Sequence, residues 1–300
     1  MTDAAAETRR GLIAAVIAYG LWGLLPLYFR LLHHVDPTEI VAQRIIWSLL
    51  LILAVLAARQ SIGPFIAALR EPKLLLPLGL SALLIAGNWL TYVWAVNQGH
   101  VVGASLGYFL NPLVNVALGV LVLKEKLRRP QMMAIGAAAL GVAILAASAV
   151  TTLWISLTLA FTFAFYGLMR KLTPVAPMTG LGVETALLVP LALAYLLWEA
   201  RHGGIGFGQD AGTSALLILA GAVTTVPLVL FAFAAQRLTM AMLGLLQYLG
   251  PTLQFLCGVL IFGETLSTGQ MLSFGLIWVG LILFASDGIA SARRSRLATA

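Results

Sequence analysis

A chain of 300 residues is long enough for one or two soluble domains, but 61% of its residues are hydrophobic, 10% are charged and its mean hydropathy is +0.99. This composition excludes an ordinary soluble protein. A net charge of +7 would favour a nucleic-acid partner in a soluble chain. Here the basic residues lie almost entirely between long apolar stretches, which is typical of a membrane protein in contact with lipid and excludes a nucleic-acid patch.

Ten apolar stretches predict ten transmembrane α-helices. One helix needs about 20 residues to cross about 30 Å of hydrocarbon, and the alternating pattern of membrane β-strands is absent. The stretches are 11–32, 38–58, 73–97, 101–123, 130–149, 152–171, 178–198, 213–236, 240–262 and 268–288. A shorter apolar segment within 59–72 is expected to lie at the membrane interface. The sequence therefore predicts an all-α integral membrane protein.

Almost all basic residues fall on one side of the membrane if these helices alternate in direction. Only Arg201 falls on the other side, and Arg30 and Arg44 lie within spans. The basic side carries Arg9, Arg10, Arg59, Arg70, Lys73, Lys124, Lys126, Arg128, Arg129, Arg170, Lys171, Arg237, Arg293, Arg294 and Arg296. Because such a bias marks the cytoplasmic side, both termini are predicted to be cytoplasmic.

The sequence contains an internal duplication with a spacing of 139 residues. Residues 104–127 match residues 243–266 without a gap. The matched pairs include Pro112 and Pro251, Asn115 and Gln254, Gly119 and Gly258, and Glu125 and Glu264. Similar pairs outside this stretch divide the chain into a first repeat, 1–149, and a second, 150–300, with five helices each. Since five is odd, the second repeat is predicted to enter the membrane in the inverted sense.

Inverted repeats indicate transport. Two related halves inserted upside down can exchange conformations, so a site between them opens alternately to either side. The alternatives are a membrane partner protein without transport activity and an intramembrane enzyme on the same scaffold. The sequence shows no clustered catalytic acids or histidines, no metal-ligand spacing and no phosphate-binding loop. We therefore predict no enzyme activity, no metal and no cofactor.

Several motifs carry a resemblance to a known family. They are Ala18–Gly23 with Pro26–Phe29, Glu39–Ile40 with Arg44–Ser48, Asn88–Trp89 with Trp94–Asn97, Ser105–Phe109 with Asn111–Leu113, Glu184–Thr185, and Gln247–Tyr248 with Gly250–Thr252. Over essentially its whole length the chain resembles the RarD subfamily of EamA-type transporters, within the drug/metabolite transporter superfamily. The resemblance implies a multi-pass protein of the bacterial inner membrane that moves, and preferably exports, a small organic metabolite or drug-like solute.

Polar and aromatic side chains within the spans are the candidate substrate-binding residues. Tyr108, Asn111 and Asn115 share one face of their helix, and Gln247 and Gln254 occupy the equivalent places in the second repeat. Further candidates on other helices are Tyr19, Trp22, Asn88, Tyr92 and Tyr166. Such side chains can line a cavity or join neighbouring helices by hydrogen bonds, and the sequence leaves both interpretations open.

Charged residues and prolines within the spans suggest further roles. Glu184 has no basic residue within one helical turn and is the candidate for coupling to protons, against a purely structural hydrogen bond. Arg44 either extends toward the interface or pairs with Glu39 or another helix. Pro112 and Pro251 are candidate hinges, or static kinks. The coupling ion and the choice between monomer and homodimer stay open.

Overall fold

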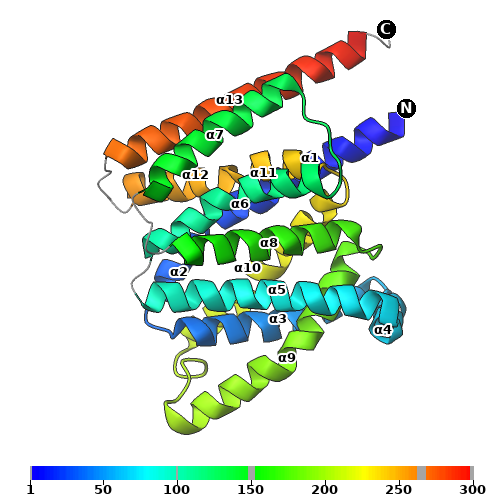
Figure 1. The fold of residues 1–300 in the computed structure, drawn as a ribbon. Helices are drawn as coiled ribbons and strands as arrows, with labels where there is room; N and C mark the ends of the chain where they lie inside the picture. Colours follow the sequence, from blue (N-terminus) through cyan, green and yellow to red (C-terminus); the bar gives the residue numbers. More distant parts are fainter. Residues whose placement is uncertain (1, 99–100, 148–152, 262–267, 298–300) are drawn as a thin grey trace.

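The computed structural model describes residues 2–98, 101–147, 153–261 and 268–297, nearly all of them helical (Figure 1). The helices are α1 (Thr2–Gly23), α2 (Leu25–Leu31), α3 (Pro37–Ala58), α4 (Ile62–Arg70), α5 (Pro72–Asn97), α6 (Val101–Leu121), α7 (Arg129–Ala147), α8 (Leu153–Leu172), α9 (Pro177–His202), α10 (Ala211–Ala235), α11 (Met240–Gln247), α12 (Leu249–Leu256), the π-helical η2 (Cys257–Ile261) and α13 (Thr268–Leu297). The described part contains no β-strand, which confirms the predicted all-α class.

Each of the ten predicted spans contains a described helix, although two spans are divided. The first consists of α1 and α2, and the ninth of α11, α12 and η2. Within the described ranges, eight spans are long and apolar enough to cross a membrane, whereas α6 and α13 hold the shorter apolar windows Leu106–Leu121 and Met271–Phe284. Helix α4 lies in the predicted interfacial segment. The chain is therefore a multi-pass membrane protein.

Prolines account for the two divided spans. Helix α1 gives way to α2 at Leu24, two residues before Pro26, and α11 gives way to α12 at Tyr248, three residues before Pro251. A proline lacks the backbone donor and its ring clashes with the carbonyl four residues earlier, so it kinks or breaks a helix near that place. Pro112, by contrast, lies inside the continuous α6. The two candidate hinges are thus unequal here, and their bending during transport remains a prediction.

Helix packing repeats between the two predicted halves. In the first half, α5 and α6 both pack on α8, the first helix of the second half. Their equivalents in the second half, α10 and the pair α11 and α12, pack in the same way on α1, the first helix of the first half. The pairs α3–α9, α6–α11 and α7–α13 join equivalent helices, and Figure 1 shows α7 and α13 together at one edge of the bundle. Two inverted repeats related by a two-fold axis would give this pattern, and the division near residue 149 stays a prediction.

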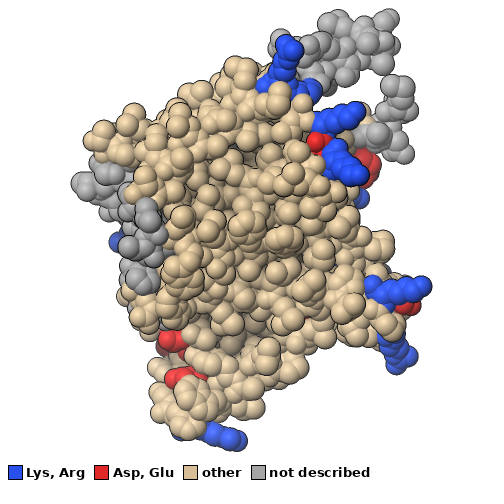
Figure 2. Space-filling view, in the orientation of Figure 1, with Lys and Arg blue, Asp and Glu red and all other residues tan. Residues whose placement is uncertain are grey.

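The surface is that of a protein surrounded by lipid. Leucines face outward with exposed fractions of 79% at Leu76, 77% at Leu121 and 75% at Leu260. Soluble monomers rarely expose so much contiguous apolar surface. In Figure 2 a broad uncharged band covers the middle of the bundle, and Lys and Arg gather mainly at one end. Figure 1 shows both chain ends at that same end.

Gly221 permits the close crossing of α10 over α3, and a side chain there should destabilise the fold. A Cβ atom on Gly221 would lie 2.6 Å from the carbonyl carbon and 2.8 Å from the carbonyl oxygen of Trp47. We expect Gly221→Ala to lower the free energy of unfolding by about 1–3 kcal/mol. The matched control is Gly136→Ala, where the new Cβ meets no atom within 4 Å. Equal unfolding temperatures of the two variants in detergent would contradict this expectation.

Candidate functional site

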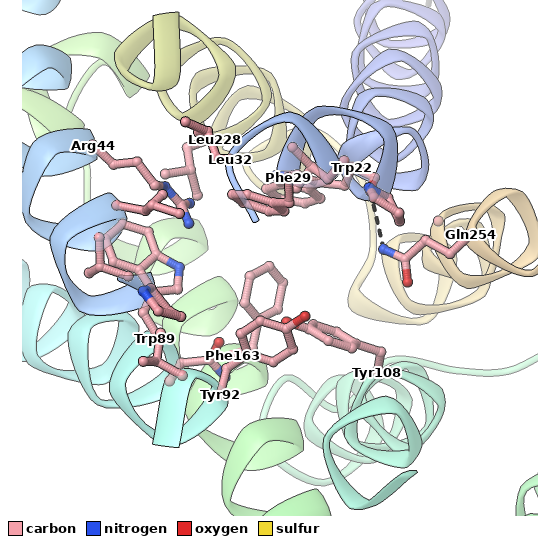
Figure 3. A pocket seen from close by; sticks show the side chains of 18 of the residues that line it. Trp22, Phe29, Leu32, Arg44, Trp89, Tyr92, Tyr108, Phe163, Leu228 and Gln254 are labelled. Atoms are coloured by element: carbon pink, nitrogen blue, oxygen red, sulfur yellow. Dashed lines mark hydrogen bonds between the residues drawn. The ribbon is translucent and has the colours of Figure 1, made fainter. Parts of the chain in front are cut away.

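A cavity of about 620 Å³ lies between helices of both predicted halves (Figure 3). Its walls come from α1, α2, α3, α5 and α6 of the first half and from α8, α10, α11 and α12 of the second. The cavity extends to His33 and Val35 in the connection between α2 and α3, at the end of the bundle opposite the termini. Its volume is typical of sites that hold drug-sized organic molecules.

Aromatic rings form much of the cavity wall. Trp22 meets Phe163 edge to face with ring centroids 5.6 Å apart, and the Tyr19 ring lies 5.8 Å from the Trp22 ring. Figure 3 shows Trp22 and Phe29 on one side of the space and Trp89 on another. Rings on several sides favour a solute with an aromatic or other apolar body.

Arg44 is the only Lys, Arg, Asp or Glu among the described residues that line the cavity. Its Nε donates a hydrogen bond to Oγ1 of Thr224 at 2.8 Å, and its guanidinium carbon lies 4.8 Å from the centroid of the Trp89 ring. None of the ion pairs in the described part of the chain involves Arg44. Of the alternatives that the sequence leaves open for Arg44, the structure shows a contact with another helix rather than a pair with Glu39, and the positive charge faces the cavity (Figure 3).

Three predicted amides line the cavity while also bonding to neighbouring helices. Asn88 donates to the Leu159 carbonyl at 2.9 Å, Gln254 donates to the Trp22 carbonyl at 3.1 Å, and Gln247 accepts from Asn115 at 2.8 Å. These bonds fix each side chain on a wall of the cavity. The two interpretations left open by the sequence therefore both apply to the same residues.

Tyr92 and Tyr108 also line the cavity, with ring centroids 5.8 Å apart. Neither hydroxyl has a hydrogen-bond partner within the described part of the chain. Each is therefore available to a solute. Seven of the ten candidate binding residues thus border one space, namely Tyr19, Trp22, Asn88, Tyr92, Tyr108, Gln247 and Gln254.

The other three candidates lie outside the cavity in this conformation. Asn111 is 1% exposed and donates to the Ala160 carbonyl of α8 at 2.6 Å. Asn115 is 0% exposed and donates to Asn111 and to Gln247 of α11. The Tyr166 ring stacks on Phe231 with centroids 5.9 Å apart. These side chains join helices, because their faces of α6 and α8 are covered by neighbouring helices.

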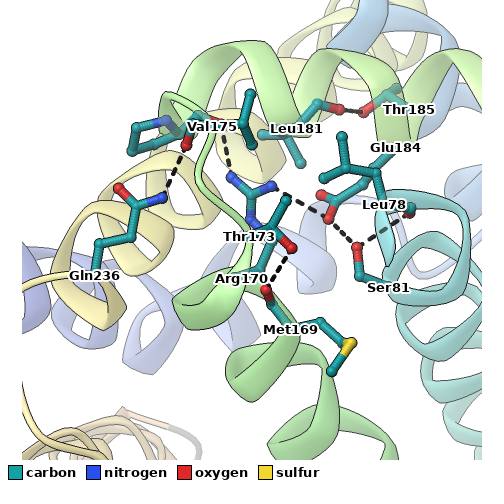
Figure 4. A network of polar contacts seen from close by, with 11 residues as sticks. Leu78, Ser81, Met169, Arg170, Thr173, Val175, Leu181, Glu184, Thr185 and Gln236 are labelled. Atoms are coloured by element: carbon teal, nitrogen blue, oxygen red, sulfur yellow. Dashed lines mark hydrogen bonds and ion pairs between the residues drawn. The ribbon is translucent and has the colours of Figure 1, made fainter. Parts of the chain in front are cut away.

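Glu184 forms a buried ion pair with Arg170 (Figure 4). Arg170 Nη1 lies 3.5 Å from Glu184 Oε1, Ser81 of α5 donates to the same oxygen, and Arg170 Nη2 donates to the Pro177 carbonyl at 3.0 Å. Arg170 is 0% exposed and Glu184 is 1% exposed. The sequence does not reveal this ion pair, because Arg170 lies 14 residues from Glu184 on another helix. It also does not reveal that Arg170 is buried, since the charge pattern assigns Arg170 to the basic side of the membrane.

Two further carboxylates hold connections between helices in place. Glu39 accepts hydrogen bonds from the backbone N–H groups of Gly206 at 2.9 Å and Phe207 at 3.0 Å. Glu125 accepts from the N–H groups of Met240 and Ala241, at the start of α11, at 2.7 and 3.1 Å. These carboxylates therefore satisfy backbone donors that a loop or helix start leaves unpaired. Glu264, the repeat equivalent of Glu125, lies outside the described residues.

Comparison with known proteins decides the family. The model of the EamA-like transporter family matches residues 9–147. An uncharacterized transporter of Pseudomonas aeruginosa is 47% identical, over 97% of this chain and 98% of that protein. Protein RarD of Escherichia coli K12 is 42% identical over 97% and 99%, and the chloramphenicol-sensitive protein RarD of Pseudomonas aeruginosa is 30% identical over 95% and 96%. This chain belongs to the RarD subfamily of EamA-like transporters.

A solved crystal structure supports the fold of this RarD subfamily member. That protein is 21% identical, and the two superpose with a TM-score of 0.71 over 91% of this chain and 96% of the other. Because the family consists of transporters, the alternative of an intramembrane enzyme is set aside. No group of three or more His, Cys, Asp or Glu side chains among the described residues is arranged to hold a metal ion.

Three aromatic residues of the cavity wall are absent from the candidates that the sequence suggests. Phe29, Trp89 and Phe163 line the cavity but are not among the ten candidates from the sequence, where Phe29 and Trp89 occur only within the motifs of the RarD resemblance. Their spacing held a signal, because Trp89 follows Asn88 and Phe163 lies three residues before Tyr166. Ring size alone does not distinguish a wall from ordinary packing, so only the tertiary structure assigns them.

Proposed function

We propose that this chain is a secondary transporter that exports a small organic metabolite or drug-like solute across the bacterial inner membrane by alternating access. The observation that carries the proposal is the cavity bordered by both predicted halves and reaching one end of the bundle. Two inverted halves can exchange conformations and so open such a site to either side. Export follows the resemblance to the RarD subfamily, one member of which is described as chloramphenicol-sensitive.

The described conformation corresponds to the outward-open state of this cycle. The cavity reaches the α2–α3 connection, whereas the pair of Arg170 and Glu184 joins the end of α8 to the start of α9 at the end that carries the termini. The accumulation of Lys and Arg at that end supports a cytoplasmic location for it (Figure 2). The inner side is thus closed by buried polar contacts while the outer side is accessible.

Arg44 and Glu184 occupy equivalent places in the two repeats. Helix α3 starts at Pro37 and α9 starts at Pro177. Arg44 lies seven residues after Pro37, and Glu184 lies seven residues after Pro177. Arg44 binds a hydroxyl of α10 and Glu184 binds a hydroxyl of α5, which are themselves equivalent helices. In the inward-open state we expect Glu184 to face the opened side and Arg44 to be enclosed.

Coupling to protons is part of this proposal and makes a separate prediction. Opening of the inner side would separate Glu184 from Arg170 and expose its carboxylate to the cytoplasm, where it can bind a proton. In the described conformation Arg170 faces Glu184, and the hydroxyl of Tyr166 is also close enough to interact with Glu184 electrostatically. We expect Glu184→Gln to lose dependence of transport on a pH gradient while keeping exchange of solute across the membrane. Full dependence on the gradient in the variant would contradict this role.

A metabolite-wide transport screen in proteoliposomes tests the proposed function. The purified chain should move at least one organic solute, and Tyr108→Ala should change the apparent affinity or rate because Tyr108 borders the cavity. Trp198→Ala is the control, since Trp198 is 56% exposed and lies outside the cavity. Oriented reconstitution then reports the direction of net movement. Failure to move any solute would contradict transport and favour a partner protein without transport activity.

A further inference from the structure

We infer that the cargo is an organic anion with an aromatic or other apolar body, whose carboxylate binds Arg44, Tyr92 and Tyr108. This inference rests on the proposed transport function and adds the chemical class of the solute. Its starting point is the charge balance of the cavity. Among the described lining residues there is one permanent positive charge and no carboxylate.

The guanidinium of Arg44 has unused donors. It carries five N–H groups, of which only the Nε group has a hydrogen-bond partner within the described part of the chain, namely Thr224. That bond and the contact with the ring of Trp89 hold the group in place while leaving its terminal nitrogens free. Arg44 lies on the membrane-spanning α3, lines the cavity and forms none of the ion pairs of the described residues, so its free donors are available to an anionic ligand.

Two more donors converge on the same space. The hydroxyls of Tyr92 and Tyr108 lie near enough to Arg44 to interact with it electrostatically, and neither has a partner in the described residues. Figure 3 shows the three side chains directed into one cavity. A carboxylate has two oxygens with about four acceptor sites, so it can accept from Arg44 and from both hydroxyls together.

The aromatic walls of the cavity indicate the chemistry of the part of the solute that lies beside the carboxylate. Trp22, Phe29 and Phe163 present aromatic rings to the cavity, so an apolar body would fill the space beside the carboxylate. With a single fixed cation, the site is matched to a monoanion. No carboxylate in the described lining can receive an ammonium group, so a zwitterion should bind less well than an anion of the same shape.

A matched ligand series on the purified full-length chain tests this inference by isothermal titration. The probes are phenylacetate, its neutral isostere 2-phenylacetamide, phenethylammonium and phenylalanine, with indole-3-acetate as a second anion. We expect the two anions to bind about 10- to 100-fold more tightly than the amide, the ammonium or the zwitterion, because bonds to a charged group are the strong ones.

Variants assign the binding to these side chains. Arg44→Gln should remove the preference for anions, Arg44→Lys should retain part of it, and Tyr108→Phe should weaken binding of the anions more than binding of the amide, whose carbonyl accepts a weaker bond from the same hydroxyl. The matched controls are Arg201→Gln, which removes an exposed charge outside the cavity, and Tyr28→Phe, whose hydroxyl already bonds to the Leu216 carbonyl. Unfolding temperatures without ligand show whether each variant is folded.

The outcomes separate this inference from the transport proposal. An anion preference that persists in a folded Arg44→Gln variant would overturn it, as would equal binding of the amide or no saturable binding of either anion. If the proteoliposome screen finds a neutral or cationic cargo, transport stands and the anion site is wrong. If the anions bind through Arg44 but nothing is transported, the site stands and the transport proposal is wrong.

Discussion

Replacing Glu184 by leucine is expected to destabilise the folded protein by about 3–5 kcal/mol, the typical loss when one member of a buried ion pair is removed. The variant would leave the guanidinium of Arg170, which is 0% exposed, without its counter-charge. Removing both charges, in Arg170→Met with Glu184→Leu, should recover most of that loss. Two apolar side chains of similar volume often replace a buried pair at little net change in stability.

The measurement is a double-mutant cycle on reversible unfolding in mixed micelles. Arg10→Met is the control, because its pair with Glu7 is exposed and such pairs contribute about 1 kcal/mol or less. Additive effects of the two single replacements would show that Arg170 and Glu184 do not depend on each other. The cycle also bears on gating, since the apolar double variant should transport with an altered rate if this pair closes the inner side.

Replacing Gly250 by phenylalanine is expected to reduce transport about tenfold or more. A bulky side chain in the space that the solute occupies should weaken solute binding by about 1–3 kcal/mol, and about 1.4 kcal/mol corresponds to a tenfold change in affinity. Gly250 borders the cavity on α12, and a Cβ there would meet only the Tyr19 carbonyl oxygen, at 3.6 Å. The new ring therefore has room to enter the cavity without displacing a helix. Solute should then be excluded while the fold is kept.

Transport into proteoliposomes by wild type, Gly250→Ala and Gly250→Phe gives a graded series. Gly20→Phe is the matched control on α1, since a Cβ at Gly20 meets no atom within 4 Å and Gly20 does not border the cavity. The unfolding temperature of each variant separates a blocked cavity from a damaged fold. Wild-type transport by a folded Gly250→Phe variant would show that the solute passes elsewhere.

Sequence reasoning succeeded where the bilayer itself imposes a pattern. The ten apolar stretches and the one-sided distribution of Lys and Arg follow from the thickness of hydrocarbon and the cost of moving charge through it. The sequence did not predict which prolines divide a span into two helices. Pro26 and Pro251 divide their spans while Pro112 does not, although all three lie within apolar stretches. Whether a proline breaks a helix depends on how neighbouring helices pack on it.

The sequence by itself determined the membrane class, the spans, the duplication and the RarD family, because these follow from composition, from the lengths of apolar stretches, from repeated residues and from motifs, all of which are local properties of the chain. Only the tertiary structure decided which polar side chains face a cavity. Tyr108 borders it while Asn111, one turn away on the same helix, bonds to α8. A periodic stripe identifies a helix face that avoids lipid, but neighbouring helices decide whether that face meets a cavity or is covered. For the same reason, Glu184 forms an ion pair with Arg170, whereas Arg44 has no carboxylate partner within the described residues.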